Sequence, residues 1–131
     1  MTEAYDIAAV RHFQDGMLLK HERRACNADQ LFGFAAECAI KMALHGAGVF
    51  SGQHLEHIPR LWDLAPLHGL QKRFPALVVL LRTQGSPFQD WSTDQRYMAD
   101  GAVSPEALER HCAAAKRILG SVQLVGGRRG E

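Results

Sequence analysis

The fold of this chain is decided by residues 27–44, which read Asn27-Ala28-Asp29-Gln30-Leu31-Phe32-Gly33-Phe34-Ala35-Ala36-Glu37-Cys38-Ala39-Ile40-Lys41-Met42-Ala43-Leu44. Apolar residues recur there at helical spacing around most of the circumference. One stripe contains Leu31, Phe34 or Ala35, Cys38 and Met42. A helix that is apolar over roughly five turns is long enough to be the central member of a bundle. We expect Asn27 or Asp29 to cap it and His45-Gly46 to end it.

The length and the charge of the chain limit the classes of protein to which it can belong. Its 131 residues fit one domain, which can bury a core without disulfide staples. The net charge is +1, from 15 basic and 14 acidic residues, so no long-range field would attract nucleic acid or an anionic membrane. The longest uncharged apolar run, residues 76–81, is far too short to span a bilayer. These features predict a soluble domain that does not contact a membrane.

Cysteine usage and the N-terminal residues bear on the compartment. Cys26, Cys38 and Cys112 are an odd number of cysteines at wide spacing, which does not suit a disulfide framework and favours a reducing environment. Residues 2–6 contain two acids and lack the basic region and apolar core of a signal peptide. We therefore expect a cytoplasmic protein.

A first helix is expected before the central one, from near Thr2 to about Arg24. The connection to residues 27–44 is short, which predicts an antiparallel helical hairpin. Gly16 inside this helix costs about 1 kcal/mol relative to alanine, which indicates close packing against a neighbour. The predicted inner stripe comprises Ile7, Val10, Phe13 or Gln14, Met17 and Leu18.

Three further helices are expected after the central one. Residues 59–65 form a short helix that ends before Pro66, and Pro75 suits the first turn of a helix that includes residues 76–83. Ser104-Pro105-Glu106 combines an N-cap, a first-turn proline and an acid, and begins a last helix that reaches about Val122. The inner face of that helix would hold Leu108, Cys112, Ala115, Ile118 or Leu119, and Val122.

The remaining segments do not read as regular structure. Residues 88–101 mix aromatic and polar side chains and predict a partly irregular segment packed against the bundle. No alternating strand pattern with a partner is present. The sequence therefore predicts an all-α bundle of four or five helices, with a single domain over residues 1–125 and a disordered tail over residues 126–131.

The charges within the central helix are the first candidate for function. Glu37 and Lys41 have the favourable i, i+4 orientation of a helix ion pair. They form either a partly exposed salt bridge or a pair turned between helices, where Asp15, Arg11 or Arg96 could join a network.

Two other groups of residues contain side chains that could bind a metal or a ligand. His54 and His57 lie one turn apart, with His45 and His68 nearby in sequence, but too few firm ligands are spaced for zinc, so no metal site is predicted. Arg96-Tyr97 suits stacking on a base or contact with a phosphate, but we favour a structural anchor that docks an irregular segment onto the bundle.

The motifs together resemble a known family. Arg11-His12-x-x-Asp15 on the first helix, followed by residues 27–41 of the central helix, is similar to a HEPN domain (higher eukaryotes and prokaryotes nucleotide-binding). The later Leu61-Trp62-x-Leu64 and Arg96-Tyr97 fit the same pattern, so that the resemblance covers residues 3 to 123. It implies an up-and-down bundle of four main helices plus a short one, which is commonly a homodimer.

The resemblance also implies a function. HEPN domains bind nucleotides or RNA, often act beside a minimal nucleotidyltransferase, and occur in toxin–antitoxin and defence systems. Some cut RNA without metal through an Arg-x(4–6)-His motif, in which histidine acts as acid or base and arginine stabilises phosphate charge. No arginine in this chain precedes a histidine at that spacing, and the nearest case, Arg60 to His68, has seven residues between the two, one of which is Pro66.

We therefore expect a non-catalytic HEPN-like module that binds a nucleotide, RNA or a nucleotidyltransferase partner, with no cofactor. The predicted groove comprises Arg11, Asp15, Glu37, Lys41, Arg96 and Tyr97. One alternative is a metal-independent ribonuclease with a displaced pair drawn from Arg11, His12 or Arg96. Another is a purely structural helical protein in which the charges fix helix register.

Overall fold

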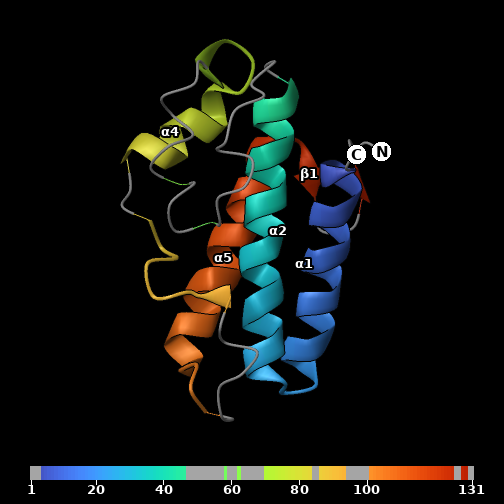
Figure 1. Cartoon of the computed structure of the whole chain (residues 1–131), viewed down its shortest axis with the longest axis vertical. Helices are drawn as coiled ribbons and strands as arrows, with labels where there is room; N and C mark the ends of the chain where they lie inside the picture. The colour runs from blue at the N-terminus through green and yellow to red at the C-terminus, as the bar shows by residue number, and fades with distance from the viewer. Residues whose placement is uncertain are drawn as a thin grey trace.

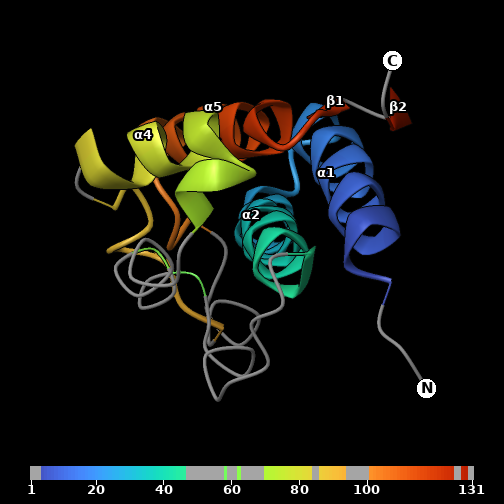
Figure 2. The same cartoon turned by 90° about the horizontal axis from the view of Figure 1, so that it is seen from above.

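The computed structural model describes residues 4–46, 58, 62, 70–83, 86–93, 101–125 and 128–129, and it confirms an all-α helical bundle. The α-helices are α1 (Tyr5–His21), α2 (Ala25–Gly46), α4 (Pro75–Thr83) and α5 (Pro105–Ser121), with a 3-10 turn η3 (Leu70–Lys72). Figure 1 shows α1 and α2 side by side with α5 against α2. Figure 2 shows α1 and α5 on two sides of α2, and α4 beside α5 on the side away from α1.

The predicted antiparallel hairpin of α1 and α2 is present, but its turn is tighter than the sequence suggested. Arg23 adopts a left-handed backbone with φ of 63°, and the amide of Arg24 donates to the carbonyl of Leu19 at 2.8 Å. The chain reverses within residues 22–24, so α2 already begins at Ala25. The expectation that Asn27 or Asp29 caps this helix is therefore wrong, because both lie inside it.

Helix α2 is the central helix, and small residues let its neighbours approach. Ala28, Ala35, Ala36 and Ala39 are all fully buried. The predicted close contact at Gly16 of α1 is present, because a Cβ placed there would lie 2.8 Å from the ring of Phe32. Apolar as α2 is, no helix in the described part of the chain is both long and apolar enough to cross a membrane.

Helix α1 faces the core with only part of the predicted stripe, Phe13 and the partly buried Val10. Ala9, Phe13 and Gly16 are buried, whereas Ile7 and Leu18 are 55% and 60% exposed. Of the predicted stripe, Phe13 is buried and packs on Phe32 with ring centroids 5.7 Å apart. The physical reason is the close α1–α2 contact, which admits alanine and glycine where a large aliphatic side chain would hold the helices apart.

Helices α4 and α5 begin where their start signals predict. The Ser104 side chain accepts a hydrogen bond from the Ala107 amide at 3.0 Å, and Pro105 occupies the first turn. Leu108, Ala115 and Ile118 are buried as expected, whereas Cys112, like Cys38 of α2, is only half-buried. Pro75 begins α4, which buries Leu77, Val78 and Leu81.

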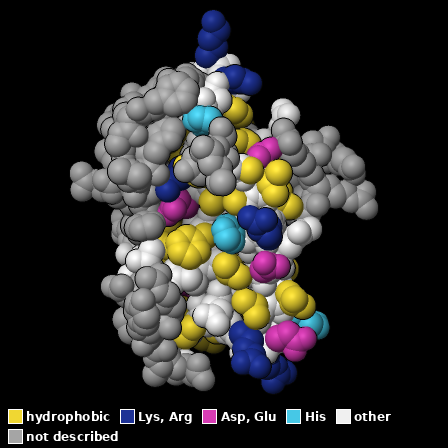
Figure 3. Space-filling model, turned by 45° about the vertical axis from the view of Figure 1, so that its right-hand side comes forward, with side chains coloured by type: hydrophobic (Ala, Val, Ile, Leu, Met, Phe, Trp, Pro, Cys, Tyr) yellow, Lys and Arg dark blue, Asp and Glu magenta, His cyan; other side chains and the backbone are white. Residues whose placement is uncertain are grey.

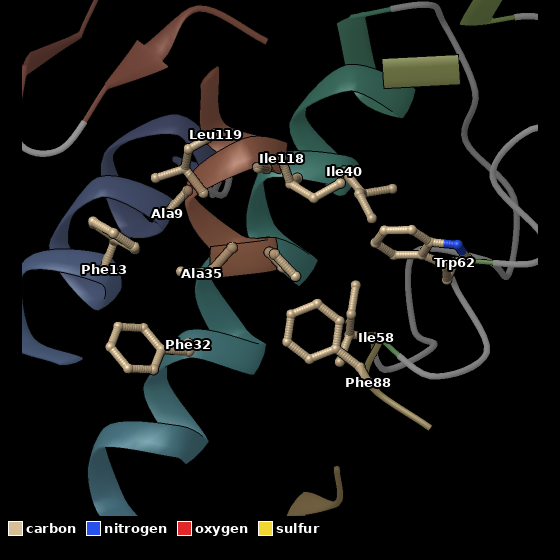
Figure 4. Packing of buried hydrophobic residues seen from close by; sticks show 14 of the residues in the cluster. Ala9, Phe13, Phe32, Ala35, Ile40, Ile58, Trp62, Phe88, Ile118 and Leu119 are labelled. Atoms are coloured by element: carbon tan, nitrogen blue, oxygen red, sulfur yellow. The ribbon is translucent and has the colours of Figure 1, made fainter. Parts of the chain in front are cut away.

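Residues 86–93 cover a second side of α2. Residues 88–93 are irregular, as expected, while residues 94–100 of the predicted segment 88–101 lie outside the described residues. Phe88 and Trp91 are buried, and Figure 4 shows Phe88 beside Ile58 and Trp62. Trp62 and Phe88 have ring centroids 6.3 Å apart. The short helix expected at residues 59–65 lies outside the described residues apart from Trp62.

Two short strands follow α5. β1 (Leu124–Val125) pairs antiparallel with β2 (Arg128–Arg129), and Gln123 enters the strand from a left-handed backbone with φ of 67°. Strands of two residues are too short to show an alternating pattern, so the sequence did not predict them. Residues 128–129 fall within the predicted disordered tail, residues 126–131, but they pair with β1.

The contact between Gly33 and Trp91 leads to the first prediction. A Cβ at Gly33 would lie 2.0 Å from Cε2 of the Trp91 ring, so Gly33→Ala must displace this buried side chain. We expect a loss of about 1–3 kcal/mol in the free energy of unfolding, measured by denaturant titration.

The matched control is Gly120→Ala in the last turn of α5, where nothing lies within 4 Å of the added Cβ. It should leave stability unchanged or raise it by up to about 1 kcal/mol. A Gly33→Ala variant as stable as the control would contradict the packing of Trp91 on α2.

Candidate functional site

Glu37 and Lys41 of α2 form a buried ion pair. Lys41 Nζ donates to Glu37 Oε2 at 3.0 Å, and the two side chains are 8% and 9% exposed. Of the two alternatives that the sequence left open, the pair is therefore the one turned into the protein. A buried charge needs its partner, because removing one member leaves the other in a poorly solvated position.

Three polar residues of α1 accompany this pair. Arg11 and Asp15 are exposed, while His12 is half-buried between α1 and α2. Burial and the neighbouring Arg11 charge lower the pKa of His12 from its ordinary value, and the opposing attraction of Asp15 and Glu37 is too weak to restore it. His12 is consequently neutral at pH 7 and offers one hydrogen-bond donor and one acceptor.

A half-buried aromatic ring and a thiol complete the surface. Phe34 contacts His12 with ring centroids 5.9 Å apart and contacts Trp91 edge to face at 5.4 Å. Burial, assisted by the Glu37 charge, raises the pKa of the Cys38 thiol to about 11, so this cysteine is protonated and unreactive at neutral pH.

Seven residues of α1 and α2 lie around His12 and Cys38, and we call them the α1–α2 face: Arg11, His12, Asp15, Phe34, Glu37, Cys38 and Lys41. Figure 3 shows this side of the molecule, where a histidine lies beside cationic and acidic groups with hydrophobic side chains between them. The face therefore mixes both signs of charge with apolar surface.

The structure places four of the six predicted groove residues on the neighbouring helices α1 and α2. Arg11, Asp15, Glu37 and Lys41 belong to the α1–α2 face, with the ion pair buried and the α1 charges exposed. The other two, Arg96 and Tyr97, lie outside the described residues. So do His54, His57 and His68 of the histidine group, and no set of potential metal ligands occurs in the part of the chain that the structure describes.

A second polar cluster, which the sequence did not predict, joins α2, α5 and the segment 86–93. The ring of His111 lies between two carboxylates, with Nδ1 2.6 Å from Asp29 Oδ1 and Nε2 2.7 Å from Asp90 Oδ1. His111 and Asp29 are fully buried, whereas the Asp90 side chain is 50% exposed. We call this the Asp29–His111–Asp90 cluster.

Neighbouring side chains hold this cluster in place. The His111 ring stacks on Phe88 with centroids 5.2 Å apart and an angle of 19° between the planes. Arg110 forms an ion pair with Asp90. Burial alone would lower the pKa of His111, but the hydrogen bonds and charges of Asp29 and Asp90 outweigh it, and the pKa lies above its ordinary value.

Asp90 shows the complementary effect. Burial opposes ionisation of its carboxyl group, yet the hydrogen bond and charge of His111, together with Arg110, prevail and lower its pKa. The two carboxylates on the ring nitrogens therefore favour the protonated imidazole, and that imidazole in turn favours the ionised form of Asp90.

The sequence held one signal for this cluster. His111 falls on the inner face of α5, between Leu108 and Ala115, where a polar residue must find a partner. Its partners could not be inferred, because the position of Asp29 in the sequence also suits a helix cap and Asp90 comes from an irregular segment. Local pattern does not show which distant carboxylates meet one histidine.

The two groups differ in what a substrate could reach. His111 is fully buried and cannot contact a substrate directly. The α1–α2 face offers one half-buried neutral histidine beside an exposed arginine, whereas general acid–base cleavage of RNA needs a positioned acid and a positioned base.

The comparisons with known proteins do not assign a family. A scan against models of protein families, a search of curated proteins and a search of solved structures each found no match to this chain.

The buried ion pair leads to the second prediction. Lys41→Met keeps the aliphatic stem but removes the cation from the Glu37 carboxylate, and we expect it to lower the free energy of unfolding by about 3–5 kcal/mol. The double variant Glu37→Gln/Lys41→Met should recover much of that loss, as measured by denaturant titration of both proteins.

Lys20→Met is the matched control on the surface. Lys20 and Glu109 form an ion pair at 2.6 Å, with side chains 27% and 66% exposed. Its loss should cost less than about 1 kcal/mol. If Lys41→Met and Lys20→Met had the same small effect, the α2 pair would not be a buried structural element.

Proposed function

We propose that this chain is a non-catalytic interaction module that pairs with a second copy through the outer stripe of α1. One observation carries the proposal: Ile7 and Leu18, 55% and 60% exposed, lie on the side of α1 opposite its buried residues. Large apolar side chains exposed on one face of a helix can be buried when that face packs against a second helix. The nearly balanced charge of the chain suits a protein partner better than a polyanion.

Helical spacing defines the stripe. Ile7, Arg11, Gln14 and Leu18 follow one another at three- and four-residue intervals, so they share one face of α1. Arg11, Gln14 and Leu18 are all exposed. The stripe thus has an apolar residue near each end and polar residues between them.

The charges of α1 match an antiparallel arrangement. If two copies pair about a twofold axis centred between His12 and Phe13, Ile7 of one protomer meets Leu18 of the other. Arg11 then lies diagonally opposite Asp15 of the second protomer, and the twofold axis repeats this contact. A symmetric interface of this kind is self-complementary in both shape and charge.

This arrangement leads to the third prediction, which uses a charge exchange. Arg11→Glu alone and Asp15→Arg alone should each place like charges opposite each other twice and weaken self-association by about tenfold or more. The double variant Arg11→Glu/Asp15→Arg restores opposite charges and should restore association. Sedimentation equilibrium over a concentration series measures the three dissociation constants.

Lys116→Glu on the exposed side of α5 is the control for a change of net charge, and it should leave association unchanged. Leu18→Ser should weaken association without lowering the free energy of unfolding, because this side chain is exposed in the monomer. The proposed pairing would be wrong if the protein were monomeric at all concentrations, or if the double variant associated no more tightly than the single variants.

Binding of a nucleotide or RNA is a second candidate function, supported by another observation. Arg11 is exposed, has no ion pair among the described residues, and lies near His12, whose ring contacts the half-buried ring of Phe34. A cation beside aromatic rings can contact a phosphate and stack on a base. A minimal nucleotidyltransferase partner and a toxin–antitoxin or defence setting are what the HEPN resemblance adds to this candidate.

The fourth prediction tests this candidate by fluorescence anisotropy with a labelled single-stranded RNA in the presence of a chelator. Arg11→Ala should weaken binding at every sequence tested and flatten its salt dependence, whereas Lys116→Ala should not. The recovered RNA should be intact. Saturating protein without any change in anisotropy would reject RNA binding, and cleaved RNA would favour the ribonuclease alternative.

A further inference from the structure

Residues 86–93, which we call the strap, lie against α2 and α5 and are attached at several points. The indole Nε1 of Trp91 donates to the Asp29 carbonyl at 2.8 Å, and Gln30 Nε2 donates to the Ser92 carbonyl at 3.2 Å. The Trp91 ring rests on Gly33 of α2. These contacts fix one end of the strap to the N-terminal half of α2.

The Asp29–His111–Asp90 cluster fastens the strap to both helices at once. Asp29 comes from α2, His111 from α5 and Asp90 from the strap itself, and both ring nitrogens lie within hydrogen-bond distance of a carboxylate oxygen. A neutral imidazole has one N–H donor, so it can serve only one of two ionised carboxylates. An imidazole that donates to both must carry two protons.

We propose that doubly protonated His111 is a latch that holds the strap on α2 and α5, and that loss of one proton releases the strap while the helices stay packed. The two ends of the latch differ in the cost of losing their hydrogen bond. Asp29 is fully buried and cannot reach water, whereas the Asp90 side chain is 50% exposed, so water can replace the lost hydrogen bond as the strap moves away. Deprotonation therefore breaks the Asp90 end first.

The charged groups around the ring set the direction of the pH dependence. Asp29 faces His111 from α2 and Asp90 faces it from the strap, while the neighbouring Arg110 of α5 pairs with Asp90, and the strap also supplies the uncharged Phe88 ring. The pKa of His111 is raised above its ordinary value of 6.5. The stabilisation is therefore fully present below that value and is lost as pH rises through the raised pKa of the folded protein.

Release of the strap would change the surface beside the α1–α2 face. Trp91 covers Gly33 and contacts the ring of Phe34, which belongs to that face. When Trp91 withdraws, both become accessible to solvent or to a ligand. The latch is independent of the proposed pairing of α1, because none of its residues lies on the outer stripe.

The fifth prediction follows the indole N–H signals of the two tryptophans by NMR between pH 5.5 and 9.5, with Trp62→Phe used to assign them. The Trp91 signal should shift and exchange faster with water in one transition above pH 6.5, while the far-UV circular dichroism stays constant. Asp90→Asn removes one carboxylate and should move the midpoint to lower pH by about one unit.

Asp15→Asn, which removes an exposed carboxylate of α1, is the matched control and should leave the midpoint unchanged. His111→Gln should abolish the transition. If His111→Gln does not fold, the shift of the midpoint in Asp90→Asn decides whether His111 acts as a latch. A Trp91 signal that is constant over the whole range would overturn the latch. So would a midpoint unmoved by Asp90→Asn, or a transition that coincides with loss of helicity.

Discussion

The burial of α2 on nearly every side is the constraint on which the rest of this structure depends. One helix supplies core surface to α1, to α5 and to the segment 86–93. Alanine and glycine let these neighbours come close, while Phe32, Ile40 and Leu44 fill the remaining space. A helix enclosed in this way has few positions at which a polar side chain can reach water.

The polar residues of α2 therefore decide how the molecule is held together. Lys41 and Glu37 are buried one turn apart on α2 and form an ion pair with each other. Asp29 instead contacts His111 of α5. Both contacts stabilise the fold because the alternative is an unpaired buried charge. Polar side chains meet solvent instead on the outer side of α1 and at Asp90 of the strap, whose side chain is 50% exposed.

Much of this fold could be predicted from local sequence, and the site only in part. Ser104-Pro105 and Pro75 mark helix starts that need no tertiary information, and residues 27–44 show the central helix by their periodicity. The inner face of α1 was predicted only in part. Phe13 and the close contact at Gly16 were expected, whereas Ala9 is selected by close approach to α2 rather than by hydrophobicity. The pairing of Glu37 with Lys41 is local and was predicted, while the meeting of Asp29, Asp90 and His111 joins three distant segments.

Native-state hydrogen exchange of the α2 amides tests the central role of this helix most directly. If α2 is the enclosed unit on which the other elements depend, the amides from Ala35 to Leu44 should exchange only through global unfolding. They would then share one free energy and one denaturant dependence, equal to those of the whole protein. Exchange of the amides around Glu37 and Lys41 through a local opening, at a clearly lower free energy than the amides of α5, would contradict this account.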